Sequence, residues 1–186
     1  MEFTLTYDGP LTASGSKAAL KQRVRSQLHP QIQALWDIEP LKSKREAVDP
    51  AATGNGAGVL LSSVGDCQFA CLISDAYRLR AQLQITLLRP EEPGSLLVRG
   101  GDIDNRLKTL LDALRRPQTD QEMPPGWTPS VSEHPFFCLL DDDRLVTGIA
   151  VDTDRLLASS QPDHVRLLIK VSVRAVAPTW WSVAVI

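Results

Sequence analysis

The sequence predicts a single α+β domain in which helices pack on a mixed, largely antiparallel sheet. Several segments alternate apolar and polar residues, as strands with one buried face do. The segment 103–115 carries one apolar stripe at helical spacing. A length of 186 residues with 43% hydrophobic and 23% charged residues suits one globular domain with a sizeable core. We therefore expect one domain over residues 1–186, with a proline-rich insertion at about 116–136.

The first 45 residues predict a strand followed by a basic helical segment. Residues 2–7 alternate apolar and polar side chains, and Asp8-Gly9-Pro10 ends that strand. From Ser16 the pattern becomes helical, and we expect Pro30 to interrupt it before a second short helix. Seven basic and four acidic side chains give this region a charge of +3. A solvated helix face is the ordinary interpretation of such a charge run.

The remaining elements follow from periodicity and turn residues. The glycine-rich segment 49–58 predicts a turn, because no Lys-Ser or Lys-Thr follows to make it a phosphate-binding loop. Residues 137–140 form a short apolar run that predicts a buried strand, and Asp152 and Asp154 suggest a turn or hairpin end. We expect the apolar C-terminal segment 178–186 to pack on the sheet or at a subunit interface. The other expected strands are residues 59–64, 68–73, 79–88, 145–151 and 164–176.

Charge, cysteine content and hydropathy limit the classes of function. Twenty basic and 22 acidic residues give a net charge of −2, which excludes a chain that binds nucleic acid simply by being basic. An odd number of cysteines, three, does not make a disulfide framework and favours a reducing compartment. No apolar run approaches the roughly 20 residues that span a bilayer, and the N-terminus lacks a signal-peptide pattern. We expect a cytoplasmic protein without a membrane partner.

Two groups of carboxylates carry the chemical information. Asp102 and Asp104 stand at the junction of a glycine turn and the predicted helix, and Lys108 and Asp112 follow Asp104 at successive i+4 positions. The second group, residues 141–143, ends the apolar run 137–140. If the two groups meet, four or five negative charges gather and favour a bound cation. Mg²⁺ prefers carboxylate oxygens, so with a lysine nearby the site predicts phosphodiester hydrolysis.

A structural interpretation of these residues stands beside the catalytic one. Asp102 suits a helix N-cap, and Asp104 with Lys108 suits a surface ion pair worth about 0.3 kcal/mol. Residues 141–143 suit a turn. Each feature alone favours this structural role, whereas their combination at the ends of two apolar elements favours a site.

The combined pattern resembles a known family. The string DIDNRLKTLLDAL at 102–114, followed by Asp142, Asp143 and Val146, is similar to the signature of the RusA family of Holliday junction resolvases. The resemblance covers roughly residues 79–176, with an opening strand and helix in plausible order. It implies a small, homodimeric, Mg²⁺-dependent endodeoxyribonuclease of phage or bacterial origin, with a mixed α/β fold, that cleaves branched DNA in recombination and repair. Mn²⁺ is an alternative cofactor.

The resemblance also implies roles for individual residues. Asp102, Asp104 and Asp143 would be the metal-binding catalytic carboxylates, and Lys108 the catalytic lysine. Asp142 would be a further metal ligand, and Asn105 and Asp112 supporting polar residues. Basic side chains would hold the DNA, and the candidates are Lys17, Lys21, Arg23, Arg25, Arg166, Lys170 and Arg174. The proline-rich insertion at 116–136 and the charge of −2 depart from the family pattern.

Other functions remain as alternatives. A RusA-like fold that binds DNA or protein without catalysis is favoured by the net charge and the insertion. A metal-dependent phosphodiesterase acting on nucleotides would share the same carboxylates. An EF-hand fails, because Leu107 and Ala113 stand where its glycine and glutamate belong. Isolated histidines and a lone Cys67–Cys71 pair make a zinc site improbable.

Overall fold

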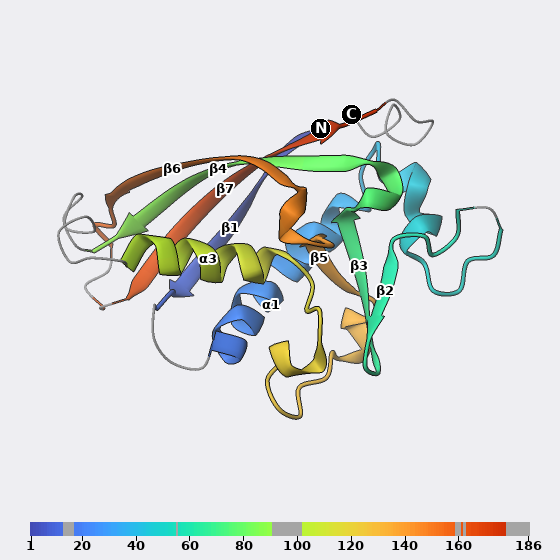
Figure 1. Ribbon diagram of the computed structural model, residues 1–186, viewed down its shortest axis with the longest axis horizontal. Helices are drawn as coiled ribbons and strands as arrows, with labels where there is room; N and C mark the ends of the chain where they lie inside the picture. The colour runs from blue at the N-terminus through green and yellow to red at the C-terminus, as the bar shows by residue number, and fades with distance from the viewer. Residues whose placement is uncertain (13–16, 55, 91–101, 159–160, 162, 178–186) are drawn as a thin grey trace.

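The computed structural model describes residues 1–12, 17–54, 56–90, 102–158, 161 and 163–177, with the side chain of Asp102 excepted. Within these residues the fold is α+β, as the sequence predicts, but its strands form two sheets rather than one (Figure 1). The expected packing of residues 178–186 falls outside the described residues. No helix in the described part of the chain has the length and apolar character needed to cross a membrane.

The larger sheet has the strand order β1-β7-β4-β6. Strand β7 pairs antiparallel with both β1 and β4, whereas β6 runs parallel to β4 and forms one edge. The bounds are β1 Glu2–Pro10, β4 Leu79–Arg89, β6 Val146–Arg155 and β7 His164–Ala175. The sheet is thus largely antiparallel, with one parallel pair at its β6 side.

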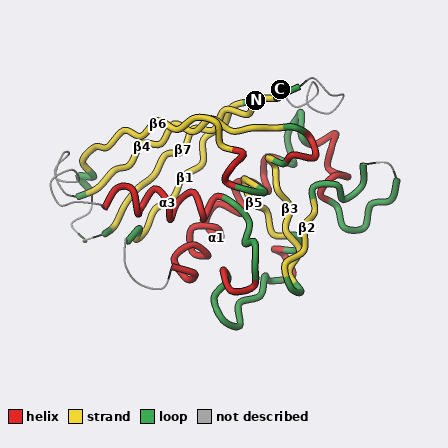
Figure 2. The backbone as a smooth tube through the Cα atoms, in the orientation of Figure 1, coloured by secondary structure: helices red, strands yellow, loops and turns green. Residues whose placement is uncertain are grey.

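The smaller sheet has the order β2-β3-β5 and packs at one end of the molecule (Figure 2). Strands β2 (Leu61–Val64) and β3 (Cys67–Ile73) form an antiparallel hairpin, and β5 (Phe136–Leu140) joins β3 in parallel. All five residues of β5 are buried, as expected for the apolar run before the three aspartates.

Helices α1 (Lys17–Leu35) and α3 (Asp102–Leu114) lie side by side over one face of the larger sheet (Figure 1). Alternation along the strands gives this face its apolar side chains, such as Leu83 and Ile85 of β4 and Leu167 and Ile169 of β7. The alternate residues of the same strands form the opposite face, which neither α1 nor α3 covers. We call this second surface the open face of the sheet.

Pro30 does not end the first helix, and the prediction of two helices is wrong. Helix α1 continues from Lys17 to Leu35 with Pro30 inside it. Proline removes one backbone hydrogen bond, at a cost of about 3 kcal/mol. Leu28 and Ile32, on either side of it, are both fully buried in the main core, and this packing offsets the loss.

The residues Asp152 and Asp154 lie within β6, not in a turn. They pair in register with Thr86 and Leu88 of β4, so the strand extends four residues beyond its predicted end. Parallel pairing with β4 holds these polar residues in the strand, and both are exposed.

The residues between α3 and β5 contain two short 3-10 turns, η3 (Asp120–Glu122) and η4 (Val131–Glu133).

Candidate functional site

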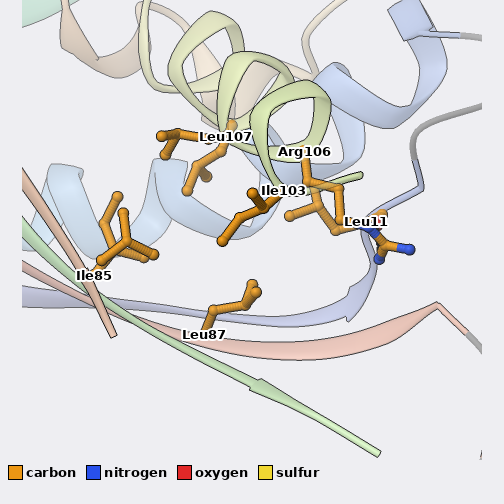
Figure 3. A pocket seen from close by; sticks show the side chains of 8 residues that line it. Leu11, Ile85, Leu87, Ile103, Arg106 and Leu107 are labelled. Carbon is orange, nitrogen blue, oxygen red and sulfur yellow. Dashed lines mark hydrogen bonds between the residues drawn. The ribbon is translucent and has the colours of Figure 1, made fainter. Parts of the chain in front are cut away.

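Helix α3 is fixed to the sheet by one apolar side. Ile103, Leu107 and Leu110 line a narrow apolar cavity together with Ile85 and Leu87 of β4. Figure 3 shows Ile103 and Leu107 facing the two strand residues across it. Arg106 borders this cavity, and its guanidinium donates to the carbonyl of Leu11 and pairs with Asp163 at 2.8 Å. These contacts fix the rotation of the helix about its axis, and therefore the direction of its polar side.

The polar side of α3 presents the motif residues to solvent. Asp104, Asn105 and Lys108 are exposed. Asp104 and Lys108 make no ion pair with any residue that the structure describes, and Asn105 accepts a hydrogen bond from Thr109 through its backbone carbonyl. Exposed, unpaired charges of opposite sign on a rigid helix can bind a substrate or an ion.

Asp112 belongs to a different environment from Asp104 and Lys108. Its Oδ2 lies 2.7 Å from Nζ of Lys21 on α1, and its Oδ1 lies 3.4 Å from Arg115. Both Lys21 and Asp112 side chains are largely buried by these contacts. Eight residues of helix rotate Asp112 by about 80° from Asp104, which turns it toward α1. The expected supporting role of Asp112 is therefore a link between two helices.

Arg25 stabilises the C-terminal end of α3. Its Nε donates to the carbonyl of Arg115 at 3.0 Å and its Nη2 to the carbonyl of Asp112 at 2.8 Å. These carbonyls have no partner inside the helix, and a cation there also opposes the negative end of the helix dipole. Arg25 is 2% exposed, so its assignment to a DNA-binding surface is wrong.

The second acidic group lies beside the C-terminal end of α3. Asp141 pairs with Arg116 at 2.5 Å. Asp142 caps the 3-10 turn η5 (Asp143–Leu145) by accepting from the backbone N–H of Arg144 at 2.9 Å. Asp143 is exposed and makes no ion pair within the described residues, although its charge acts on nearby Arg115.

The two acidic groups do not meet within one copy of the chain. Asp104 lies in the first turn of α3 and Asp143 beside its last turn, so about 15 Å of helix separates them. Among the described residues no group of three or more histidine, cysteine, aspartate or glutamate side chains could hold a metal ion. The Asp102 side chain lies outside the described residues, so its predicted place beside Asp104 stays a prediction.

The remaining basic residues proposed for DNA binding lie on two separate surfaces. Arg166, Lys170 and Arg174 alternate along β7 on the open face, where Arg166 pairs with Asp8 and Lys170 with Glu2. Lys17, Lys21 and Arg23 lie on α1, on the other side of the sheet. Of these, Lys17 and Arg23 are exposed. Only the α1 group shares a layer with Asp104 and Lys108.

Sequence reasoning missed the cationic partners of the acidic residues. Arg115 bonds both carboxylate oxygens of Glu122, at 2.9 and 3.2 Å, and Arg116 bonds Asp141. Arg115 and Arg116 directly follow the helix, and basic residues are favoured at helix C-termini. Their position was the sequence signal that could have predicted these ion pairs.

The chain was also compared with known proteins. No protein-family model matches it, and neither curated proteins nor solved structures gave a match. Function is therefore inferred from the residues and their placement.

Proposed function

We propose that this protein is a metal-dependent endonuclease that cleaves branched DNA, with the N-terminal half of α3 as its catalytic surface. The observation that supports this proposal is the exposed pair Asp104 and Lys108, which has no structural partner among the described residues and lies on a helix held rigidly by its apolar side. Residues that stabilise nothing in the fold, within a specific motif, favour a role toward a ligand.

The donor chemistry suits Mg²⁺ or Mn²⁺. Asp102 and Asp104 would hold the ion through carboxylate oxygens, which hard divalent cations prefer. When bound, the ion would polarise the phosphodiester and activate water. Lys108 would place its ammonium one helical turn from Asp104, where it can stabilise negative charge on the phosphate. Lys17 is an exposed cation on the same layer that can contact the DNA backbone.

The test is cleavage of a synthetic four-way junction, with linear duplex as substrate control, in Mg²⁺ and in EDTA. We expect paired cuts near the crossover that require the metal. Asp104→Asn and Lys108→Ala should each lower the rate about a hundredfold or more. Asp152→Asn is the matched control, because Asp152 is also exposed but lies in β6 on the open face. Equal loss in Asp152→Asn, or full activity in Asp104→Asn, would contradict the proposal.

The second candidate is a protein that binds branched DNA without cutting it. The separation of Asp104 from Asp143 within one chain favours it, because the described carboxylates of a single copy do not complete a metal site. This candidate predicts that the wild type binds the junction in EDTA and leaves it uncut in Mg²⁺ and Mn²⁺.

A further inference from the structure

The carboxylates of the larger sheet all lie on its edge strands. Glu2 and Asp8 are in β1, and Asp152 and Asp154 are in β6. The two central strands, β4 and β7, contain no aspartate or glutamate. The polar side chains that these strands place on the open face are cations and hydrogen-bond donors, namely Arg80, Gln82, Gln84, Thr86, His164, Arg166, Lys170, Ser172 and Arg174. The middle of the open face therefore favours an anionic ligand.

One end of the open face carries positive charge that the fold does not neutralise. Arg80 of β4 and Arg174 of β7 are directly opposite each other in the antiparallel pair, where Cα atoms are about 4.5 to 5.5 Å apart. Like charges in such positions destabilise a strand pair. Arg174 is exposed and makes no ion pair with any residue that the structure describes. A bound anion would remove the repulsion between the two arginines.

Arg144 extends this charge around the end of the sheet. One oxygen of the Asp75 carboxylate lies 2.8 Å from Nη2 of Arg80, and the other lies 2.9 Å from Nη2 of Arg144. Asp142 also lies near Arg144, at 3.9 Å. The Arg144 side chain is 70% exposed, and Arg144 directly follows Asp143 in the sequence. A cationic path therefore leads from the second acidic group to the open face.

Arg78 completes this cluster at the start of β4. It is exposed, and its carbonyl accepts from the N–H of Val176 at 2.9 Å, which places its backbone beside the end of β7. It makes no ion pair within the part of the chain that the structure describes. Four arginines against Asp75 and Asp142 leave an excess of two positive charges. We call this cluster the arginine surface, formed by Arg78, Arg80, Arg144 and Arg174.

The other end of the open face is unsuited to an anion. Arg166 pairs with Asp8 at 2.6 Å, so its charge is neutralised. Asp152 and Asp154 of β6 are exposed beside this end of β4. An anion bound to the open face is therefore confined to the arginine surface.

The arginine surface and the polar side of α3 face opposite directions. Helices α1 and α3 cover one face of the larger sheet (Figure 1), and Arg174 lies on the other. Lys108 is exposed on the side of α3 away from the sheet. A straight DNA duplex, with a persistence length of about 150 base pairs, is too stiff to bend around the sheet and contact both surfaces. The arms of branched DNA leave the crossover in different directions, so two arms can reach both surfaces.

We propose that the arginine surface binds the phosphate backbone of a second DNA arm while helix α3 contacts the crossover. This proposal rests on the proposed function, because it assigns a second surface to the same substrate. Arginine is a common donor to phosphate oxygens, and the exposed Gln82 and Gln84 follow Arg80 on the same face as further donors. Contacts to phosphate do not read sequence. The arginine surface thus selects branched over linear DNA by shape alone.

Contact with two arms raises the affinity for a junction above that for a duplex. Once α3 has bound near the crossover, the second arm meets the arginine surface at a high effective concentration. A linear duplex can occupy either surface but not both. Selectivity for the junction should therefore depend on Arg80 and Arg174 and should not require a metal ion.

Binding is tested in EDTA by fluorescence anisotropy, with a synthetic four-way junction and a linear duplex that has the sequence of one arm. The wild type should bind the junction more tightly. The double variant Arg80→Gln with Arg174→Gln should weaken junction binding at least about tenfold. Duplex binding should change by less than about twofold, because the α3 surface remains. Equal weakening for the two substrates, or no weakening for the junction, would overturn the proposal.

Arg166→Gln is the matched control. It removes the same charge from the same strand and the same face, about 27 Å from Arg174. The Debye length at physiological salt is only about 8 Å. Arg174→Gln alone should weaken junction binding severalfold, whereas Arg166→Gln should not. Equal losses in these two single variants would assign the effect to overall charge and overturn the arginine surface.

The number of phosphate contacts is tested by the dependence of binding on salt. Each phosphate contact adds about 0.9 to the slope of log K against log salt concentration. The wild-type slope should be steeper for the junction than for the duplex. The double variant should lower the junction slope by about 2 and leave the duplex slope nearly unchanged. A junction slope that is the same in the wild type and the double variant would overturn the phosphate contact.

A stability measurement separates loss of binding from loss of folding. The charged neighbours of Arg174 are Arg80, which repels it, and Glu2, which attracts it and is already paired with Lys170. Arg174→Gln should therefore shift the thermal midpoint of unfolding by no more than about 2 °C. A larger fall would mean that Arg174 supports the fold, and would overturn its assignment to a ligand.

The nuclease proposal succeeds or fails separately from this one. Selective junction binding through both surfaces, without cleavage in Mg²⁺, would contradict the nuclease and support the arginine surface. If the nuclease is active, Arg174→Gln should raise KM severalfold and leave kcat nearly unchanged, because the remote arm is held equally before and during cleavage. An unchanged KM with cleavage intact would overturn the arginine surface and leave the nuclease in place.

Discussion

The charged side chains at the two ends of helix α3 differ in whether they have partners within the fold. At the C-terminal end, Arg25 bonds the last carbonyls, Lys21 pairs with Asp112, and Arg116 pairs with Asp141. At the N-terminal end, Asp104 and Lys108 are exposed and unpaired within the described residues. One end uses its charges to hold the helix in place, and the other leaves its charges available to a ligand.

This contrast predicts that stability and the proposed function depend on opposite ends of one helix. Substitutions at the C-terminal end should change the free energy of unfolding, because each removes a buried or half-buried partner. Substitutions at the N-terminal end should leave that free energy nearly unchanged, because exposed unpaired residues contribute little to it. Measurements of stability in variants at the two ends should show this difference.

Arg25→Ala should lower the free energy of unfolding by about 3 kcal/mol, because it leaves buried carbonyls of α3 without a donor and creates a cavity. Urea denaturation followed by circular dichroism measures the change. Arg23→Ala, two residues away and exposed, is the control and should shift it by no more than about 0.5 kcal/mol. Similar values for the two variants would contradict the capping role of Arg25.

His29 should make stability fall at acid pH. It lies one turn after Arg25, its Nδ1 accepts from the N–H of Phe137 at 2.8 Å, and burial lowers its pKa below the ordinary value despite nearby Glu133. The unfolded chain therefore binds a proton more readily as the pH falls below about 6.5. Stability should decline from there by up to about 1.4 kcal/mol per pH unit.

The measurement is the free energy of unfolding between pH 5 and pH 7.5, roughly the range in which histidine titrates. His29→Gln should remove most of the slope near pH 6, whereas His134→Gln, at an exposed position, should retain it. A slope unchanged in His29→Gln would assign the acid sensitivity to other groups.

The Lys21–Asp112 pair should contribute about 1 kcal/mol, more than an exposed pair, because its side chains are 13% and 16% exposed. A double-mutant cycle with Lys21→Met and Asp112→Asn isolates this coupling energy. This coupling energy should decrease less in 0.5 M NaCl than the coupling energy of an exposed pair such as Lys170–Glu2. A coupling energy near zero would remove this link between α1 and α3.

Asp104→Asn and Lys108→Gln should change stability least, by at most about 0.5 kcal/mol each, mainly through the helix dipole acting on Asp104. Thermal unfolding of each variant beside the wild type gives the comparison. A loss above about 1.5 kcal/mol in either variant would assign these residues to the fold and weaken the case for a catalytic surface.

The sequence predicted the elements that depend on local pattern. The alternation in β4 and the apolar stripe of α3 appear as predicted. Each pattern matches the period of one secondary structure, and burial of the apolar side stabilises that structure. Pro30 was misjudged because the tertiary packing of Leu28 and Ile32 outweighs a local preference. The second sheet was missed because β3 and β5 are far apart in sequence and nothing local specifies their parallel pairing.

The candidate site was predicted in its residues but not in its arrangement. The motif identified Asp104 and Lys108 as a pair, and both are exposed as a site requires. Spacing could not show that Asp143 lies at the far end of α3, since that follows from where β5 ends. Arg25 looked like any other member of a basic run, and only the neighbouring helix end reveals its role.

Gln27 and Gln31 of α1 also set a limit on assembly. A sheet with two free edges can add copies indefinitely and grow into a fibre. The side-chain amide of Gln31 bonds the backbone N–H and carbonyl of Thr6, and that of Gln27 bonds those of Asp8, so a further strand cannot pair along that part of β1. Edge-to-edge growth of the larger sheet through this part of β1 is therefore blocked.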